Sequence, residues 1–212
     1  DSEWINTHVD CPFLQKFRSI KSENPGKGIV IATGHLGSFE ILAHAAAIYG
    51  HPLSFVVRNA KLPRVDAWWR GIREANGNKV ISRKGAFKEI MREVSAGRDV
   101  GILFDQNVTA NHAVFVDWFG YPAATTKSVA LSALRSESPV IVAGVVYVGD
   151  GRYRIMAEQI SVEDIYRSEL SADEKVREIT ERASKAYQRY ILDYPEQWFW
   201  MHRRWKTQPE QQ

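Results

Sequence analysis

The sequence predicts an α/β protein in which a mixed, mainly parallel central sheet is flanked by helices. Apolar runs alternate with segments of helical periodicity through most of the 212 residues, which is the pattern of βαβ units. The apolar runs at 140–148 and 153–157 flank a Gly-Asp-Gly loop, which is typical of an antiparallel hairpin. That pair of strands would make an otherwise parallel sheet mixed.

Each expected strand is a short apolar run bounded by glycine or polar residues. We expect strands at 28–32, 53–57, 79–81, 100–104, 140–148 and 153–157. Segments with apolar residues at helical spacing lie between most of them, and Gly50 and Gly97 are placed as helix terminators. We expect helices at 9–20, 38–49, 62–75, 85–95, 127–136 and 172–192.

Length and composition indicate one globular domain, spanning residues 1–212, with a frayed polar tail at 208–212. The net charge is only +3, which does not point to nucleic acid as a partner. Cys11 is the only cysteine, so no internal disulfide can form. No apolar run approaches the roughly 18 residues that span a bilayer, so the chain as given should be soluble or peripheral. Because it begins at Asp1 without methionine, we expect an N-terminal piece to be missing.

The motif Thr-Gly-His-Leu-Gly-Ser-Phe-Glu at 33–40 places a histidine and a carboxylate at a strand-to-helix junction. On one continuous helix, residues five apart point about 140° away from each other, so His35 and Glu40 meet only if His35 lies in the loop. Ser38 can cap the helix, and Glu40 in its first turn can reach back to the imidazole. Such a pair is a general base. The alternative is that Glu40 only favours the helix N-terminus and His35 is an ordinary loop residue.

Three further polar residues, Arg58, Arg83 and Asp105, each follow a predicted strand, as His35 does. In open α/β sheets the ligand crevice lies at the carboxyl ends of parallel strands, so we expect these four residues to share a site. Arg58 and Arg83 can grip a phosphate, although each alone can equally be a surface cation. Asp105 with Gln106 is a candidate substrate contact, and its alternative role is that of a strand-end turn residue.

The C-terminal segment, residues 195–206, mixes tryptophans with cations. This mixture is expected of a surface that meets anionic lipid headgroups. Alternatively, the tryptophans fill the core while the cations stay in water. The residues concerned are Trp198, Trp200, Arg203, Arg204, Trp205 and Lys206.

Six blocks of the sequence, taken in order, resemble a known set. They are His35-x4-Glu40, Val-Arg-Asn at 57–59, Ser-Arg-Lys-Gly at 82–85, Asp105-Gln106, 115–126 and 195–206. They resemble the bacterial lipid A biosynthesis acyltransferases, within the lysophospholipid acyltransferase superfamily, over about residues 28–207. The resemblance implies a glycerolipid-acyltransferase-like fold and a His-x4-Glu general-base pair. It also places Asp105 and Gln106 in a substrate-contacting block, in which Asn107 stands where a second acid is common.

The resemblance further implies transfer of a fatty acyl chain from acyl carrier protein or acyl-coenzyme A to a hydroxyl of a lipid A precursor. The thioester is a co-substrate, so no cofactor or metal is expected. The implied location is the cytoplasmic face of the bacterial inner membrane, at an anionic surface, with a transmembrane anchor in the missing N-terminal piece. The turn-like run at 119–125 would help to shape an acyl groove, or serve packing alone.

Other functions fit less well. The nearest alternative within the same chemistry is a phosphatidylinositol mannoside acyltransferase, which resembles the same family, or another glycolipid or lysophospholipid acyltransferase. A non-catalytic membrane-surface module explains the C-terminal segment but not the residues after the strands. A metal site from His35, Glu40 and His44 lacks the usual ligand spacing. The sequence also lacks the Gly-x-Ser-x-Gly elbow of serine hydrolases and the glycine-rich phosphate loops.

Overall fold

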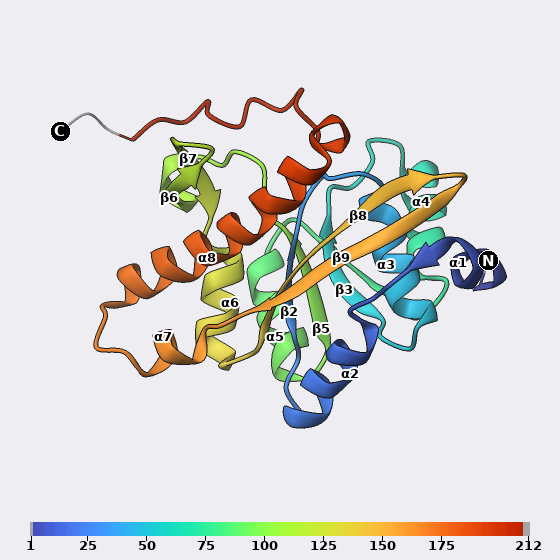
Figure 1. Ribbon diagram of the computed structural model, residues 1–212, viewed down its shortest axis with the longest axis horizontal. Coiled ribbons are helices and arrows are strands. Elements are labelled where there is room, and N and C mark those ends of the chain that lie inside the picture. Colours follow the sequence, from blue (N-terminus) through green and yellow to red (C-terminus); the bar gives the residue numbers. More distant parts are fainter. Residues whose placement is uncertain (1, 210–212) are drawn as a thin grey trace.

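The computed structural model describes residues 2–209, and its centre is a seven-stranded sheet in the order β1-β9-β8-β2-β5-β3-β4 (Figure 1). Strands β8, β2, β5, β3 and β4 run parallel, whereas β9 is antiparallel to β8. The mixed, mainly parallel sheet is therefore confirmed. The strands are β1 (Val9–Asp10), β2 (Val30–Thr33), β3 (Leu53–Val57), β4 (Lys79–Ser82), β5 (Asp99–Leu103), β8 (Val140–Gly149) and β9 (Arg152–Ile160).

Helices cover both faces of this sheet, because successive side chains of a strand point to opposite faces. Val30 and Ala32 of β2 join one hydrophobic cluster, whereas Ile29 and Ile31 join the other. Helices α5, α6, α7 and α8 contribute to the first cluster, and α1, α2 and α3 to the second. The helices are α1 (Ser2–His8), α2 (Leu14–Glu23), α3 (Phe39–Ile48), α4 (Pro63–Glu74), α5 (Ala86–Ser95), α6 (Ser128–Ser136), α7 (Glu163–Arg167) and α8 (Ala172–Asp193).

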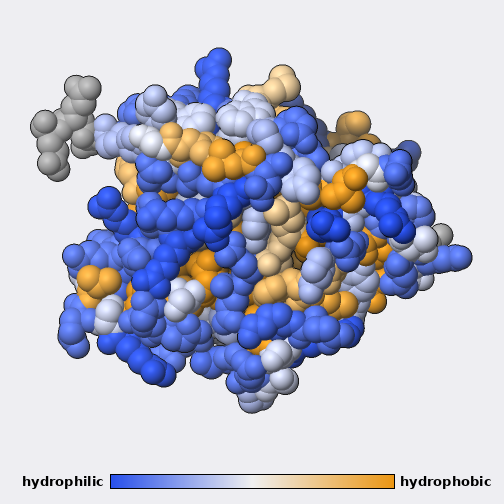
Figure 2. All heavy atoms as spheres, viewed as in Figure 1, coloured by the Kyte–Doolittle hydropathy of each residue, from blue (hydrophilic) through white to orange (hydrophobic). Residues whose placement is uncertain are grey.

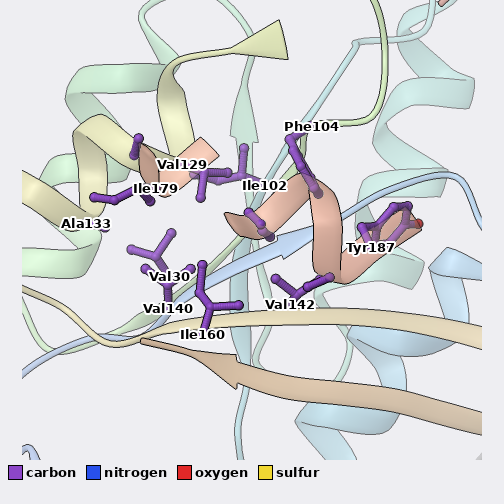
Figure 3. Packing of buried hydrophobic residues seen from close by; sticks show 14 of the residues in the cluster. Val30, Ile102, Phe104, Val129, Ala133, Val140, Val142, Ile160, Ile179 and Tyr187 are labelled. Atoms are coloured by element: carbon purple, nitrogen blue, oxygen red, sulfur yellow. The ribbon is translucent and has the colours of Figure 1, made fainter. Parts of the chain in front are cut away.

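The larger hydrophobic cluster lies where the long helix α8 crosses the sheet, and Figure 3 shows its side chains converging from strands and helices. Ile179 and Tyr187 of α8 meet Val30, Ile102 and other strand residues there. A capping box formed by Ser171 and Glu174 begins α8, as the Ser-x-x-Glu spacing allows. The outer face seen in Figure 2 is mostly hydrophilic, with hydrophobic residues in small patches.

A second, two-stranded sheet of β6 (Ala113–Trp118) and β7 (Tyr121–Thr126) occupies the stretch where the sequence predicts only a rigid turn before a helix. Residues 119–125 form the turn and most of β7. Phe119 and Gly120 both have positive φ, 56° and 84°, which suits a two-residue hairpin. β6 packs against α8, and Trp118 is fully buried between them and the core. This burial is what fixes the hairpin.

The expectation of a helix at 9–20 is wrong at its start. Val9 and Asp10 instead pair with Tyr153 and Arg154 at the edge of the sheet as β1. Pro12 follows, and proline disfavours helix in the residue before it, so α2 begins only at Leu14. The two shortest helices, α1 and α7, were not predicted, and a 3-10 helix (Ala110–His112) lies in the connection after β5. The end of the tail expected at 208–212 lies outside the described residues.

Buried Glu93 of α5 ties the helix layer to β3, β4 and the turn before β5. Its carboxylate accepts hydrogen bonds from Ser54, Lys79 and Arg98. The bond from Arg98 is the main cause that lowers the pKa of Glu93 to about 2, against burial, which raises it. An ionised carboxylate without these donors would be expensive in the interior. The network therefore holds together the amino ends of β3 and β4 and the start of β5.

We predict that Glu93→Gln lowers the free energy of unfolding at pH 7 by about 3 kcal/mol, because a pKa shift stores about 1.4 kcal/mol per unit. The folded-state pKa lies below the ordinary value of 4.5, so this stability is present above pH 4.5. It is lost as the pH falls from 4.5 toward 2. Urea titrations across that range should show the parent and the variant converging. Glu89→Gln on the same helix, which removes an exposed pair with Arg92, should change stability by only about 0.5 kcal/mol. A pH-independent difference for Glu93→Gln would contradict the prediction.

Candidate active site

The loop between β2 and α3 carries His35, and two glycines allow the loop to lie against its neighbours. A Cβ on Gly34 would lie 2.5 Å from the Asp105 carboxyl carbon, so a larger residue has no room. Gly37 has φ +54°, and a Cβ there would meet the carbonyl oxygen of Val145 at 2.0 Å. The loop is therefore pressed between the end of β5 and the middle of β8. His35 lies in the loop, as the sequence predicts.

Asp105, two residues beyond β5, is the hydrogen-bond partner of the His35 ring. Oδ1 of Asp105 lies 2.8 Å from Nδ1 of His35, and Oδ2 accepts from the His35 backbone N–H at 2.7 Å. The carboxyl group is 2% exposed and the imidazole 21%. Strands β2 and β5 are parallel neighbours, so their carboxyl ends place these two residues side by side. A buried carboxylate at Nδ1 fixes the tautomer that carries its proton on Nδ1.

The C-terminal segment, residues 195–206, closes this arrangement from the other side. Nε1 of Trp198 donates to Oδ2 of Asp105 at 2.9 Å, and the indole is buried. The backbone pairs as well: the Gly37 N–H donates to Gln197 at 2.8 Å, and the Phe199 N–H donates to His35 at 3.1 Å. Asp105 thus accepts three N–H hydrogen bonds, which compensate its burial.

The second ring nitrogen of His35 is directed away from Asp105. With the proton on Nδ1, Nε2 carries the lone pair, and the Gln106 amide nitrogen lies 3.3 Å from it. A substrate hydroxyl that displaced this amide would find a proton acceptor in place. Asp105 and Gln106 are therefore neighbours of the imidazole, one at each ring nitrogen. The strand-end argument predicts this closeness for Asp105.

A pocket of about 260 Å³ opens beside the imidazole between α3, α4 and the sheet. His35, Glu40, Arg58 and Arg73 provide its polar groups. Its remaining lining is mainly apolar and comes from β2, β3, β5 and α3: Ile31, Phe39, Leu42, Leu53, Phe55, Val57 and Leu103 are among these residues. A mostly apolar cavity with a few convergent polar groups is the usual form of a small-molecule site.

Glu40 lines this pocket but does not hold the imidazole in the way the sequence predicts. Its carboxylate is paired with the guanidinium of Arg73 on α4, with Nε of Arg73 3.1 Å from Oε2. Asp105 occupies the place at Nδ1 that was assigned to Glu40. Sequence reasoning missed Arg73 because it lies inside a helix, after no strand. Its i+4 spacing from Trp69, over whose ring it lies at 5.0 Å, was the only local signal.

Arg58 and Arg83 are separated by the order of the strands. Arg58 follows β3 and lines the pocket. Arg83 follows β4, the edge strand beyond β3, and is exposed outside the residues that line the pocket. The sheet therefore brings His35, Arg58 and Asp105 to one site and leaves Arg83 at its margin.

The C-terminal segment divides between core and surface, so neither sequence interpretation holds for all of it. Arg204 is 1% exposed and donates to Ala124 and Thr125, with its guanidinium 4.4 Å from the Trp118 ring centre. Burial lowers the pKa of Arg204 to about 10, opposed by the Asp105 charge. The expectation that Arg204 faces headgroups is therefore wrong. Phe199, Trp200, Met201, Arg203 and Lys206 remain exposed.

Asn107, the residue at which the resemblance in the sequence would place a second acid, ties the site to the same segment. Its backbone N–H donates to Nε2 of His202 at 2.8 Å, and its side-chain amide exchanges two hydrogen bonds of 3.0 Å with Thr207. Burial lowers the pKa of His202, which favours the neutral, accepting ring. A carboxylate at position 107 could accept from Thr207 but could not also donate.

No group of three or more His, Cys, Asp or Glu side chains within residues 2–209 comes close enough to hold a metal ion. His44, the third candidate ligand beside His35 and Glu40, is half-buried on α3.

Comparison with known proteins adds to this geometry. A family model described as bacterial lipid A biosynthesis acyltransferase matches residues 3–207. The chain belongs to that family. The resemblance seen in the sequence motifs is confirmed, and the match extends through α1, β1 and α2, which precede the motifs.

Individual relatives are distant from this member of the acyltransferase family. The lipid A biosynthesis acyltransferase of Haemophilus influenzae is 27% identical over 128 residues, which cover 60% of this chain and 40% of that protein. The lipid A biosynthesis myristoyltransferase of Escherichia coli is 22% identical over 205 residues, 97% of this chain and 61% of that protein. The chain thus spans less than two thirds of the length of these curated relatives.

Among solved structures, the 1-acyl-sn-glycerophosphate acyltransferase PlsC from Thermotoga maritima is similar to this chain at 15% sequence identity. The match covers 93% of this chain and 76% of that one, with a TM-score of 0.47.

We predict that Asp105→Asn lowers kcat by about 10²–10⁴, because an amide cannot stabilise the imidazolium or reliably fix the ring tautomer. Glu40→Gln, which weakens the pair with Arg73 but leaves the Asp105 contact, should cost only about tenfold by loosening the pocket. The comparison needs kcat and KM from steady-state kinetics, with thermal melts to show that both variants fold. A larger loss for Glu40→Gln than for Asp105→Asn would return the orienting role to Glu40.

Proposed function

We propose that this chain carries the catalytic site of an acyltransferase that moves a fatty acyl chain from an acyl thioester to a hydroxyl of a lipid A precursor. The observation that supports this proposal most directly is the imidazole of His35, which has Nδ1 on buried Asp105 and lines a largely apolar pocket. Family membership supports acyl transfer. The nature of donor and acceptor rests on the names of the relatives and on the pocket's chemistry.

In the proposed reaction His35 acts as the general base. Nε2 takes the proton of the acceptor hydroxyl while its oxygen attacks the thioester carbonyl, and the resulting oxyanion collapses with breakage of the C–S bond. The imidazolium then returns the proton to the departing thiolate, so the products are an ester and a free thiol. Asp105 stays ionised and stabilises the imidazolium. No acyl-enzyme forms, because the thioester is already activated.

The cations at the pocket suit a phosphorylated substrate. Arg58 lines the pocket and takes part in no ion pair within the described residues, so its guanidinium is free for a phosphate of the acceptor or of a phosphopantetheine donor. Arg73 lines the same pocket and is held by Glu40. We assign Glu40 the role of positioning Arg73. Arg83, further along the sheet edge, would act only on the outer part of a large substrate.

The proposal includes partners and a location. The donor is acyl carrier protein or acyl-coenzyme A, the acceptor a membrane glycolipid, and no cofactor is required beyond the thioester co-substrate. We place the enzyme at the cytoplasmic face of the inner membrane, against anionic lipid. No helix within residues 2–209 has both the length and the apolar character needed to cross a bilayer.

We predict that His35→Ala abolishes transfer, with a loss of about 10²–10⁴ in rate, because it removes the proposed base. The measurement is mass spectrometry of lipid A from cells that lack the gene and are complemented with the full-length protein or its variant. Complementation should add one acyl chain of defined mass, which also identifies the length of the chain and the acceptor lipid.

His44→Ala, a histidine on α3 without this hydrogen-bond network, serves as the matched control and should complement fully. An acyl chain restored by a folded His35→Ala protein would overturn the mechanism. An acyl chain that appears on another glycolipid, such as a phosphatidylinositol mannoside, would redirect the acceptor. A protein that binds lipid but transfers nothing would favour a non-catalytic membrane module.

We further predict that activity survives exhaustive chelation, because the thioester supplies its own activation and the donor groups at the pocket do not converge on one point. Transfer should be measured after dialysis against a chelator and again after adding zinc. Activity that is lost on dialysis and regained with zinc would contradict the general-base mechanism proposed here.

A further inference from the structure

Helix α4 (Pro63–Glu74) presents an apolar face to solvent. None of its twelve residues is buried, although apolar side chains recur along it at helical spacing. Trp68 and Leu62, the residue just before the helix, are each 66% exposed. A helix this short is marginal in water without packing, so an unpacked apolar face points to a partner. The exposed apolar side chains are Leu62, Val65, Trp68, Trp69 and Ile72.

The charges around this face are predominantly free cations. In the part of the chain that the structure describes, Arg58, Lys61 and Arg64 are exposed and take part in no ion pair. The acidic side chains of α4 are engaged by backbone groups: Asp66 accepts from the Ala60 N–H, and Glu74 accepts from the Val80 N–H. The face therefore combines tryptophans with unpaired positive charge.

A second exposed apolar group contacts His35, which lines the same pocket. It consists of Phe199, Trp200 and Met201, and Met201 is 87% exposed. The Phe199 ring lies 6.3 Å from the His35 ring, while Arg73 of α4 lines the pocket together with His35. Each apolar group is therefore connected to the pocket through one lining residue, α4 through Arg73 and the second group through His35.

We infer that the α4 face is the surface by which the enzyme docks on an anionic bilayer, with the pocket directed toward the lipid. Tryptophan rings settle at the membrane interface, and adjacent cations are attracted by anionic headgroups. Cations alone would fit an acidic carrier protein equally well, but Trp68 and Leu62 need an apolar phase. The inference rests on the proposed function, because it supplies that reaction with its membrane-embedded acceptor.

Vesicle binding tests the inference without any need for turnover. The double variant Leu62→Ser/Trp68→Ser should weaken partitioning of the protein onto phosphatidylglycerol–phosphatidylethanolamine vesicles by at least about tenfold, equivalent to about 1.4 kcal/mol. A matched control, Tyr121→Ser/Leu192→Ser, removes side chains of similar exposure, 68% and 66%, from β7 and α8, and should bind like the parent. Lys61→Gln/Arg64→Gln should weaken binding at low salt and much less at high salt.

Transfer assays separate this inference from the proposed reaction. Leu62→Ser/Trp68→Ser should retain transfer to a detergent-dispersed acceptor and lose it with a vesicle-embedded acceptor. If His35→Ala transfers normally, the reaction mechanism fails while the vesicle results still stand. The docking inference is overturned if the double variant binds anionic vesicles as the parent does, or if the control loses as much. It is also overturned if the double variant instead dissociates a dimer of the parent, or loses only carrier-protein binding.

Discussion

The structure around the pocket depends on the burial of one carboxylate. Asp105 is 2% exposed and is compensated by three N–H groups, two from His35 and one from Trp198. An ionised carboxylate that lacked these donors would cost several kcal/mol, so the loop after β2 and the C-terminal segment must both lie against the end of β5. Arg204 adds a second buried charge, and its guanidinium lies over the Trp118 ring. The imidazole is oriented as a consequence of this packing, rather than by a partner on its own helix.

What the sequence predicts well is local. The strands of the parallel sheet are short apolar runs, and their carboxyl ends bring His35, Arg58 and Asp105 together because β2, β5 and β3 are neighbours. The partner of the imidazole was mistaken because Glu40 is five residues away and Asp105 seventy, and sequence proximity favoured the former. Spacing cannot show that Glu40 already has a partner in Arg73, since that pair joins two different helices, α3 and α4.

Burial is the other property that spacing conceals. Trp198 and Trp200 lie two residues apart in the same aromatic and basic segment, yet one is buried against Asp105 and the other is half exposed. The difference arises from the backbone pairing of 197–199 with 35–37, a long-range contact without a local signature. The β6–β7 hairpin was missed for the same reason, because the strand β6 is buried only through its contact with α8, which is distant in the sequence. Conversely, the periodicity of α4 resembles that of any core-facing helix, although nothing in the described chain covers it.

The pairing of residues 197–199 with the His35 loop also has a consequence for synthesis. A chain emerging from the ribosome can form β2 through β5 early, because these strands lie within the first half of the sequence. The hydrogen bond that Trp198 donates to Asp105 can form only after a further 93 residues have been synthesised. Such a contact of high sequence separation forms late in folding. The nascent domain therefore holds an unfinished carboxylate site until Trp198 has left the ribosome.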